Sequence, residues 1–348
     1  MAPSACDALV VCQNGDAAPQ LIRRSIPVPT PGDHQLLVRV THAAQNPTDV
    51  QSFDSNMFGD GAVLGCDFVG TVEATGPAVK RIAVGATVAG LIWGGEVKGL
   101  GAYSQYALAD ERICFPVPQG TTPEQASTIP LAAATAWLAL FSKDCLHIER
   151  GSKQAVLIWG GSSSVGNYAI QLGALEGLEV ITTCSPRHAE FVRSLGAKHV
   201  FDYRDEKVLD KIKEVAPDLK YVFDTIGGSD TSATASRAIN PSGGSLCTVR
   251  PGKANTEGVT EQTTVTDVFV WTAFLKEHRY KKFYWPPHKE DHELSAELFE
   301  KLFGLLREGR VVPNRVKVFN GGLGDVEKGF QEHRDGRISG YKIVYRVQ

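Results

Sequence analysis

A glycine- and serine-rich turn is the first feature of this 348-residue sequence that could do chemistry. Residues 159–166 read WGGSSSVG and stand between an apolar run, 155–159, and a helical pattern. A phosphate turn needs glycines where the backbone bends and approaches a pyrophosphate, with helix N-terminal amides facing the charge. Such a turn also occurs as a plain connection between strand and helix, so that alternative stays open. The expected phosphate contacts are Gly160, Gly161, Ser162, Ser163, Ser164, Val165 and Gly166.

The end of the next predicted strand indicates which dinucleotide would fit. An NAD site usually carries an Asp or Glu about 20 residues after the glycines, where it holds the ribose 2′-OH. Residues 183–188 read TCSPRH and contain no acid, but they do contain Ser185 and Arg187. A guanidinium can bind a 2′-phosphate through two parallel hydrogen bonds, whereas a carboxylate would repel it. This pattern favours NADPH; the alternative is that Ser185 only caps the next helix and Arg187 is solvated.

The elements around this turn predict a doubly wound α/β domain. From residue 154 short apolar strands alternate with helices, as a parallel sheet with crossover connections requires. We expect strands at 155–159, 179–183, 199–201, 221–224 and 244–249, and helices at 165–176, 189–195 and 208–215.

The regions before and after this part are predicted to be richer in strands. Strand-like runs separated by glycines cover residues 35–107, and prolines at 116–123 precede a helical stretch, 124–141. An aromatic and basic segment, 271–285, is followed by a predicted helix, 294–307. The tail, 311–347, has a strand-like pattern again.

Composition excludes several classes of function. The net charge is −3 and no block of Lys and Arg could neutralise a run of phosphates, so a nucleic-acid role is not expected. No apolar stretch reaches the roughly 18 to 20 residues that span a bilayer, and residues 1–11 lack a secretory pattern. The seven cysteines form no C-x-x-C pair. We therefore expect a cytoplasmic protein without a membrane contact, its thiols buried and reduced.

Several motifs occur in one order along nearly the whole chain, and together they identify a family. They resemble zinc-independent medium-chain dehydrogenases/reductases and, within these, the fungal trans-acting enoyl reductases of the lovastatin type. The resemblance implies a β-rich GroES-like catalytic domain at 1–122 and 287–348, and an NADPH-binding Rossmann domain at 123–286. The motifs are NPTD at 46–49, LGCDFVG at 64–70, GAYSQY at 101–106, ATAW at 134–137, TCSP at 183–186, LGA at 195–197, FDYR at 201–204 and SGYKIVYR at 339–346.

The positions that hold zinc in metal-dependent relatives carry other residues here. Asn46 stands at the position of the ligand cysteine, and Cys66 and Asp67 replace a His-Glu pair. A catalytic zinc needs about three protein ligands and a structural zinc four, so no metal is expected. Cys66 and Asp67 could supply two ligands, but a buried thiol beside a hydrogen-bonded Asp is the favoured interpretation.

The resemblance implies hydride transfer from the nicotinamide to the β-carbon of a conjugated carbonyl or thioester, with a proton then added at the α-carbon. The expected catalytic residues are Gln51, which stands where the enoyl reductases have a lysine, and Thr135. A glutamine amide can donate a hydrogen bond to a developing enolate but is a very poor proton donor. The alternatives are that Gln51 is only a polar pocket wall and that Thr135 is bonded back to its own helical turn.

The resemblance also suggests further contacts, each with a simpler alternative. Tyr203, Ile226 and Lys342 are expected near the cofactor; otherwise Tyr203 is a core tyrosine and Lys342 a solvated lysine. The substrate pocket is expected to include Asn46, Gln51, Trp271 and Phe283, although aromatic residues in this segment more often pack than bind. His278, His288 and His292 fit no metal-ligand spacing and are expected to be exposed.

Three functions remain open at this point. The first is an NADPH-dependent ene or enoyl reductase of specialised metabolism, acting on small-molecule or carrier-bound acyl groups with a polyketide synthase as partner. The second is a free-standing quinone or enone oxidoreductase on small diffusible substrates. The third is an NADPH-binding protein with little activity, because Gln51 replaces the family lysine. Relatives are monomers or homodimers joined along an edge strand, here residues 264–270.

Overall fold

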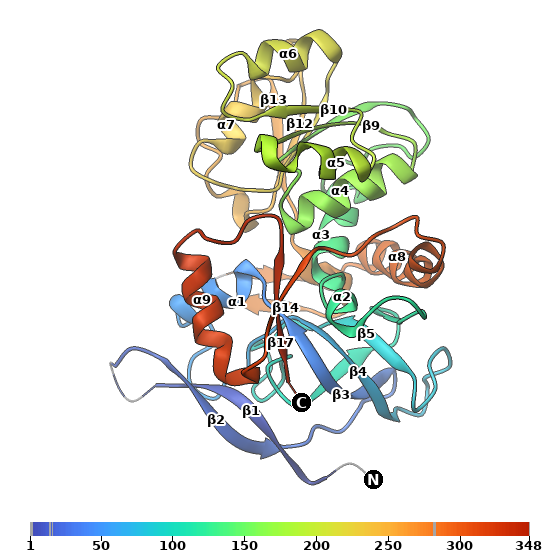
Figure 1. Ribbon diagram of the computed structural model, residues 1–348, viewed down its shortest axis with the longest axis vertical. Coiled ribbons are helices and arrows are strands. Elements are labelled where there is room, and N and C mark those ends of the chain that lie inside the picture. The colour runs from blue at the N-terminus through green and yellow to red at the C-terminus, as the bar shows by residue number, and fades with distance from the viewer. Residues whose placement is uncertain (1–2, 14, 16, 281–282, 348) are drawn as a thin grey trace. The chain divides into compact units, whose positions relative to one another are not determined.

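The protein is described from a computed structural model that covers residues 3–13, 15, 17–280 and 283–347. The chain divides into two compact units (Figure 1). The first unit comprises Met1–Leu131, Phe299–Gly309 and Pro313–Gln348, and the second comprises Ala132–Leu298 and Arg310–Val312.

The second unit is built on a parallel sheet of six strands in the order β10-β9-β8-β11-β12-β13. The strand order reverses between β8 and β11, which is the switch point at which doubly wound folds bind their ligands. The predicted doubly wound α/β fold is therefore confirmed. The strands are β8 (Ala155–Trp159), β9 (Glu179–Cys184), β10 (His199–Asp202), β11 (Tyr221–Asp224), β12 (Gly244–Thr248) and β13 (Thr263–Asp267).

Helices connect these strands and bury their apolar faces against the sheet. Leu157, Ile181 and Leu246 of the sheet pack with Ile212 of α6 and Ala235 of α7 in one buried cluster. Strands covered on both faces are continuous apolar runs, which is why AVLIW forms the central strand β8. The helices are α4 (Ser164–Leu175), α5 (Ala189–Ser194), α6 (Val208–Val215) and α7 (Thr231–Ser236), with a short hairpin of β14 (His278–Tyr280) and β15 (Phe283–Trp285).

The first unit holds a sheet in the order β16-β17-β3-β4-β5-β7, with β6 also paired to β3, and a separate pair, β1-β2. Its core joins residues from the start and the end of the chain, such as Leu64, Phe68, Phe330 and Tyr345. The predicted β-rich part is thus confirmed. The strands are β1 (Ala5–Cys12), β2 (Gln20–Pro27), β3 (Gln35–Ala44), β4 (Asp67–Thr75), β5 (Thr87–Leu91), β6 (Tyr106–Asp110), β7 (Cys114–Pro116), β16 (Val316–Phe319) and β17 (Lys342–Arg346).

The helical segments differ in several places from the sequence-based expectation, which included neither α1 nor α7. The stretch 124–141 forms two helices, α2 (Pro123–Ala126) and α3 (Pro130–Phe141), because Pro130 opens a new helix and restricts the residue before it. Helix α8 (Lys289–Arg307) begins five residues earlier than expected. The strand-like tail also contains α9 (Val326–Arg334); the remaining helix is α1 (Pro47–Asp54).

The borders of the two units also differ from the expected domain limits of 122 and 287. The first unit runs on to Leu131, and the second runs on to Leu298. The first part of α8 belongs to the second unit through its polar contacts: Asp291 accepts a hydrogen bond from Ser142, and Glu297 pairs with Arg150.

Candidate functional site

The turn after β8 is packed so closely that only glycine fits at three positions. Gly160 has a φ of +90°, and a Cβ there would lie 2.5 Å from Ile226 Cδ1. A Cβ on Gly161 would lie 2.1 Å from Thr182 Oγ1, and one on Gly166 would lie 2.4 Å from the Gly160 oxygen. The glycines therefore let the backbone turn tightly into the N-terminus of α4, and a pyrophosphate binds at turns of this kind.

The serines of this turn have different tasks. Ser163 caps α4, since its Oγ accepts the Gly166 amide at 2.9 Å, and it also lies 2.9 Å from Thr225 Oγ1. Its hydroxyl is thus committed to the helix end, whereas Ser162 and Ser164 are half-buried on either side. Helix α4, which begins at Ser164, is twelve residues long and presents the positive end of its dipole to this turn. The turn fits a bound dinucleotide.

The half-buried Ser185 and the exposed Tyr203 follow adjacent strands at the same edge of the sheet. Strands β9 and β10 are parallel and place Asp202 opposite Cys184, so Ser185 and Tyr203 follow at neighbouring strand ends. The Ser185 side chain makes no cap hydrogen bond to the short helix η1 (Pro186–His188), so the structure does not support its role as a cap alone. Arg187 is exposed two residues later.

Tyr203 lies in solvent rather than in the core, with 47% of its surface exposed and the Arg204 guanidinium 5.2 Å from its ring centroid. Asp202, the residue before Tyr203, ends β10 rather than β9, and its carboxylate lies 3.5 Å from Arg204 Nε. The end of β9 therefore carries a hydroxyl and a guanidinium where an NAD site would carry a carboxylate.

Ile226 follows β11, the strand next to β8 across the switch point. The Asp224 carboxylate fixes it, because Oδ1 accepts the amides of Ile226 at 3.0 Å and of Gly227 at 3.1 Å. The Ile226 side chain stays 44% exposed. An exposed aliphatic residue at this position can cover an apolar part of a ligand.

The expected catalytic and pocket residues are divided between the two units, each of which contains some of them. Gln51 is exposed on α1 of the first unit, and Thr135 is buried in α3 of the second. Trp271 is buried in the short helix η3 (Val270–Ala273). Phe283 begins β15, and its side chain lies outside the described part of the chain.

The first unit contains a buried ion pair that sequence reasoning missed. Lys342 Nζ lies 2.6 Å from Asp67 Oδ2 and 3.3 Å from the Thr128 oxygen, and only 3% of Lys342 is exposed. Asp67 also accepts hydrogen bonds from Asn46 Nδ2 at 2.9 Å and from the Leu131 amide at 2.7 Å. Lys342 is thus not the solvated surface lysine of the simpler alternative, and no local pattern could reveal a partner 275 residues away.

A second buried carboxylate lies in the same region. Asp49 Oδ2 accepts the Asn46 amide at 2.7 Å and the Tyr103 hydroxyl at 3.3 Å, while Oδ1 is buried without a hydrogen-bond partner. Desolvation raises the pKa of Asp49 to about 6. Burial and the neighbouring Asp49 raise the pKa of the Cys66 thiol well above its usual value, so Cys66 remains a protonated thiol.

This cluster does not fit a zinc ion. Its members at the relevant positions are the amide of Asn46, the thiol of Cys66 and the carboxylate of Asp67, which Lys342 neutralises. Zinc prefers thiolates, imidazoles and free carboxylates. Among the residues that the structure describes, no group of three or more His, Cys, Asp or Glu side chains could hold a metal ion.

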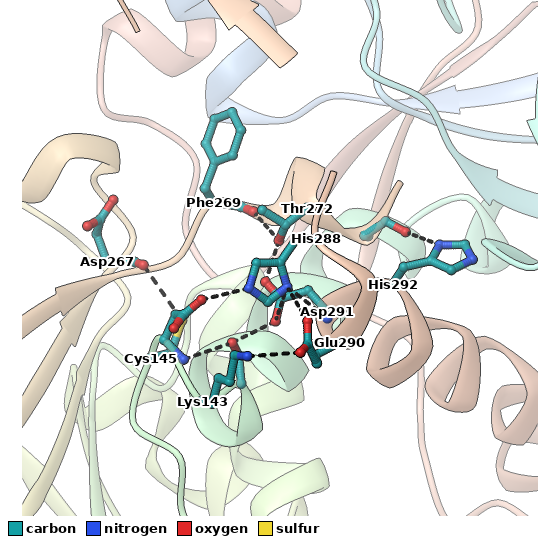
Figure 2. A network of polar contacts seen from close by, with 12 residues as sticks. Lys143, Cys145, Asp267, Phe269, Thr272, His288, Glu290, Asp291 and His292 are labelled. Carbon is teal, nitrogen blue, oxygen red and sulfur yellow. Dashed lines mark hydrogen bonds and ion pairs between the residues drawn. The ribbon is translucent and has the colours of Figure 1, made fainter. Parts of the chain in front are cut away.

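The histidines near the end of the second unit are not exposed as expected. His278 is 1% and His292 4% exposed, and His288 is partly buried. The expectation was wrong because hydrogen bonds compensate burial: His278 Nε2 lies 2.8 Å from the Trp271 oxygen and His292 Nδ1 lies 2.8 Å from the Ala273 oxygen. Figure 2 shows His288 and His292 with the residues to which they are hydrogen-bonded.

Family models and relatives cover both parts of the chain. The alcohol dehydrogenase GroES-like domain matches residues 32–119, and the zinc-binding dehydrogenase model matches residues 164–286. A zinc-type alcohol dehydrogenase-like protein of Schizosaccharomyces pombe is 33% identical, over 92% of this chain and 94% of that protein. The chain belongs to the medium-chain dehydrogenases/reductases.

Other members of this family give the resemblance more detail. A trans-enoyl reductase of Gibberella zeae is 32% identical to this medium-chain reductase over 99% of this chain and 98% of its own. An alcohol dehydrogenase superfamily protein of Novosphingobium aromaticivorans has a similar structure, with a TM-score of 0.77, 26% identity and coverage of 99% and 100%. The resemblance to fungal trans-enoyl reductases is thereby confirmed, and the protein is an oxidoreductase of a family that typically uses nicotinamide cofactors. Within the described chain, no helix is both long enough and apolar enough to cross a membrane.

Proposed function

We propose that this medium-chain reductase is an NADPH-dependent enoyl reductase that adds hydride to the β-carbon of an α,β-unsaturated carbonyl or thioester without zinc. The observation that carries the proposal is the Lys342–Asp67 ion pair, since the resemblance aligns Asp67 with a zinc-site residue of metal-dependent relatives and this carboxylate is paired with a buried ammonium. An enzyme that polarises an alcohol or a simple carbonyl through zinc needs those ligands free. Hydride addition to a conjugated system needs only hydrogen bonds to the developing enolate oxygen. The similarity to trans-enoyl reductases supports the same chemistry.

The preference for NADPH is supported by the ends of β9 and β10. Ser185 and Arg187 offer a hydroxyl and a guanidinium, and Tyr203 offers an exposed ring, on neighbouring strands. A 2′-phosphate would receive a bidentate contact from Arg187 and a hydrogen bond from Ser185. Gly160, Gly161 and Gly166 would hold the pyrophosphate with the α4 amides. When bound, the cofactor supplies the hydride; the protein supplies orientation and electrostatics.

Further contacts are proposed from the resemblance. Ile226 would pack against the cofactor. Lys342 would lie near the cofactor while its ammonium stays paired with the Asp67 carboxylate. Asn46 orients Asp67 and Asp49, so its pocket role is one of support. Trp271 and Phe283 are proposed to line the substrate pocket.

Two residues are proposed to assist the reaction. The Thr135 hydroxyl would donate a hydrogen bond to the substrate carbonyl from the buried helix α3. The Gln51 amide would donate a second hydrogen bond, without supplying a proton. The α-carbon is then protonated by water or by another side chain.

The partner is proposed to be a polyketide synthase that carries the acyl chain as a thioester. Relatives named trans-enoyl reductases carry the reductase on a chain of their own, and this protein matches them end to end. The substrate would then be a carrier-bound acyl group rather than a free small molecule.

A panel of acceptors tests the proposal. NADPH oxidation is measured with α,β-unsaturated thioesters, enones and quinones, with the unchanged protein and with Gln51→Lys. We expect turnover of thioesters in preference to quinones, and at least equal thioester turnover in Gln51→Lys. Preferred reduction of quinones would contradict the proposal and favour a free-standing oxidoreductase. No turnover of any class would favour a cofactor-binding protein.

A further inference from the structure

The short helix after the edge strand β13 is held at three consecutive residues by side chains. His278 Nε2 donates to the Trp271 oxygen at 2.8 Å, and His292 Nδ1 donates to the Ala273 oxygen at 2.8 Å. Between them, Thr272 Oγ1 donates to Asp291 Oδ2 at 2.7 Å (Figure 2). We call these three contacts the η3 clamp. Since a carbonyl oxygen can only accept, the clamp also fixes which nitrogen of each histidine carries the proton.

Asp291 connects the clamp to the end of α3. Its side chain is buried, with Oδ1 accepting the Ser142 hydroxyl at 2.7 Å, and its amide donates to His288 Nδ1 at 3.1 Å. His288 Nε2 in turn lies 2.7 Å from Asp144 Oδ2. Helix η3, the end of α3 and the start of α8 are thus joined by one polar network, most of which Figure 2 displays.

Such a network is more than a short turn needs to stay folded. Buried titratable groups are costly unless every hydrogen bond is made, and apolar side chains of similar volume often serve stability as well. What a fully bonded polar network adds is a single orientation of the groups that it holds. Here the group that it holds is the segment that carries Trp271.

The position of this segment in the fold suggests what the orientation serves. Helix η3 follows the carboxyl end of β13, and in a parallel sheet all carboxyl ends meet at one edge. The phosphate turn, Ser185 and Ile226 follow strands at that same edge. Ligands of doubly wound folds bind outside these strand ends, so Trp271 stands on the ligand-binding edge of its unit.

We propose that His278, Asp291 and His292 are positioning residues that hold Trp271 as the wall that selects the acyl group of the substrate. This inference rests on the proposed function, since it takes the substrate to be an enoyl thioester. None of the three residues touches the reacting atoms. They act through the backbone of Trp271 and Ala273 and through the Thr272 hydroxyl.

Single substitutions break the contacts one at a time. His278→Leu, Thr272→Val and His292→Leu each remove one donor. His278→Gln, Thr272→Ser and His292→Asn keep a donor, since the amide of Gln lies near the position of Nε2 and that of Asn near the position of Nδ1. The control is Ser236→Ala, which removes a buried hydroxyl that donates to the Ala233 oxygen and accepts the Thr260 amide at the end of α7. That residue lies toward the amino ends of the strands, because α7 runs back from β11 to the start of β12.

Steady-state kinetics with enoyl thioesters of increasing chain length measure selectivity. Each donor-removing variant should raise KM for the preferred substrate about tenfold with little change in kcat, and should flatten the dependence on chain length. The donor-keeping variants should recover most of the loss, and Ser236→Ala should resemble the unchanged protein. Affinity for NADPH alone should not change in any variant. A loss of stability alone, with KM and chain-length preference unaltered, would overturn the proposal.

Hydrogen exchange of the amides of residues 270–274 gives a readout that needs no substrate. The clamp predicts faster exchange there in the donor-removing variants and no change in Ser236→Ala. Unchanged exchange in all variants would overturn the clamp itself. If the unchanged protein reduced no enoyl thioester, the proposed function and the acyl selectivity would fall together, while the exchange result would still decide whether these residues hold Trp271.

Discussion

Lys342 and Asp67 form a fully buried ion pair, with Nζ 2.6 Å from Oδ2 and 3% or less of either residue exposed. The pair lies in the first unit, where Asn46 Nδ2 donates a hydrogen bond to the same Asp67 oxygen at 2.9 Å and Cys66 is a buried thiol. The Lys342 ammonium balances the charge of the Asp67 carboxylate, so this carboxylate is not free to bind a metal ion.

Removal of one partner should be costly. Lys342→Met leaves Asp67 buried without a cation, and we expect the free energy of unfolding to fall by about 3 to 5 kcal/mol. The double variant Asp67→Asn with Lys342→Met should recover part of that loss. The control is Lys143→Met, which breaks the exposed pair with Glu290 and should cost under about 1 kcal/mol. Denaturant titrations measure all three, and an equal small cost for both lysines would contradict the account of the buried pair.

The preference for NADPH should depend on Arg187. In Arg187→Glu a carboxylate replaces the guanidinium beside Ser185 and repels a 2′-phosphate, so NADPH affinity should fall by roughly tenfold to a hundredfold. NADH affinity should change little. Lys213→Glu on α6 makes the same change in net charge and should leave both affinities as they are. Fluorescence titrations with the two cofactors decide the matter; a similar loss for both, or none, would remove Arg187 from the site.

Asp49 should make stability depend on pH. Its pKa in the folded protein is about 6, above the ordinary value of 3.8, because burial disfavours the charged form. The folded state therefore holds this proton more tightly than the unfolded chain does. Stability from this group is present below about pH 4 and is lost as the pH rises to 6, a change on the order of 3 kcal/mol. The free energy of unfolding of the unchanged protein minus that of Asp49→Asn, measured from pH 4 to 7, isolates the effect, and a flat difference would refute it.

The phosphate turn should not tolerate a methyl group at Gly161. A Cβ there would lie 2.1 Å from Thr182 Oγ1, so Gly161→Ala should cost about 1 to 3 kcal/mol of stability and lower NADPH affinity at least about tenfold. Adding Thr182→Ala removes the closest atom and should restore part of the affinity. Gly304→Ala, in α8 with no atom within 4 Å of the new Cβ, should be neutral or stabilising. Titration calorimetry measures the NADPH affinity of each variant. An unaltered affinity in Gly161→Ala would show that the turn can accommodate a Cβ at this position.

The parallel sheet was the easiest part of the fold to predict. The bounds of β8, α6 and β11 agree with those expected, because short apolar runs and an amphipathic period are local signals. Strand β2 was not foreseen, since its sequence QLIRRSIP is mostly exposed and owes its conformation to pairing with β1. Tertiary pairing of this kind leaves no trace in the strand's own residues.

The candidate site shows the same division between local and long-range causes. The glycines of the turn and the pair Ser185 and Arg187 stand out in the sequence because their chemistry depends on neighbours along the chain. Lys342, His278 and His292 are charged or polar residues that look exposed by type, yet each is buried against a partner. Sequence spacing cannot reveal the Lys342 partner, because Asp67 lies 275 residues away.

The central claim is NADPH-dependent reduction of a conjugated thioester without zinc. The most direct test is the rate of NADPH oxidation with an α,β-unsaturated thioester, after exhaustive dialysis of the protein against a chelator, with NADH and added zinc as comparisons. We expect an undiminished rate in the dialysed protein, no gain on adding zinc, and a kcat/KM with NADH at least about tenfold lower. Loss of activity on dialysis with recovery on adding zinc, or equal use of NADH, would contradict this claim.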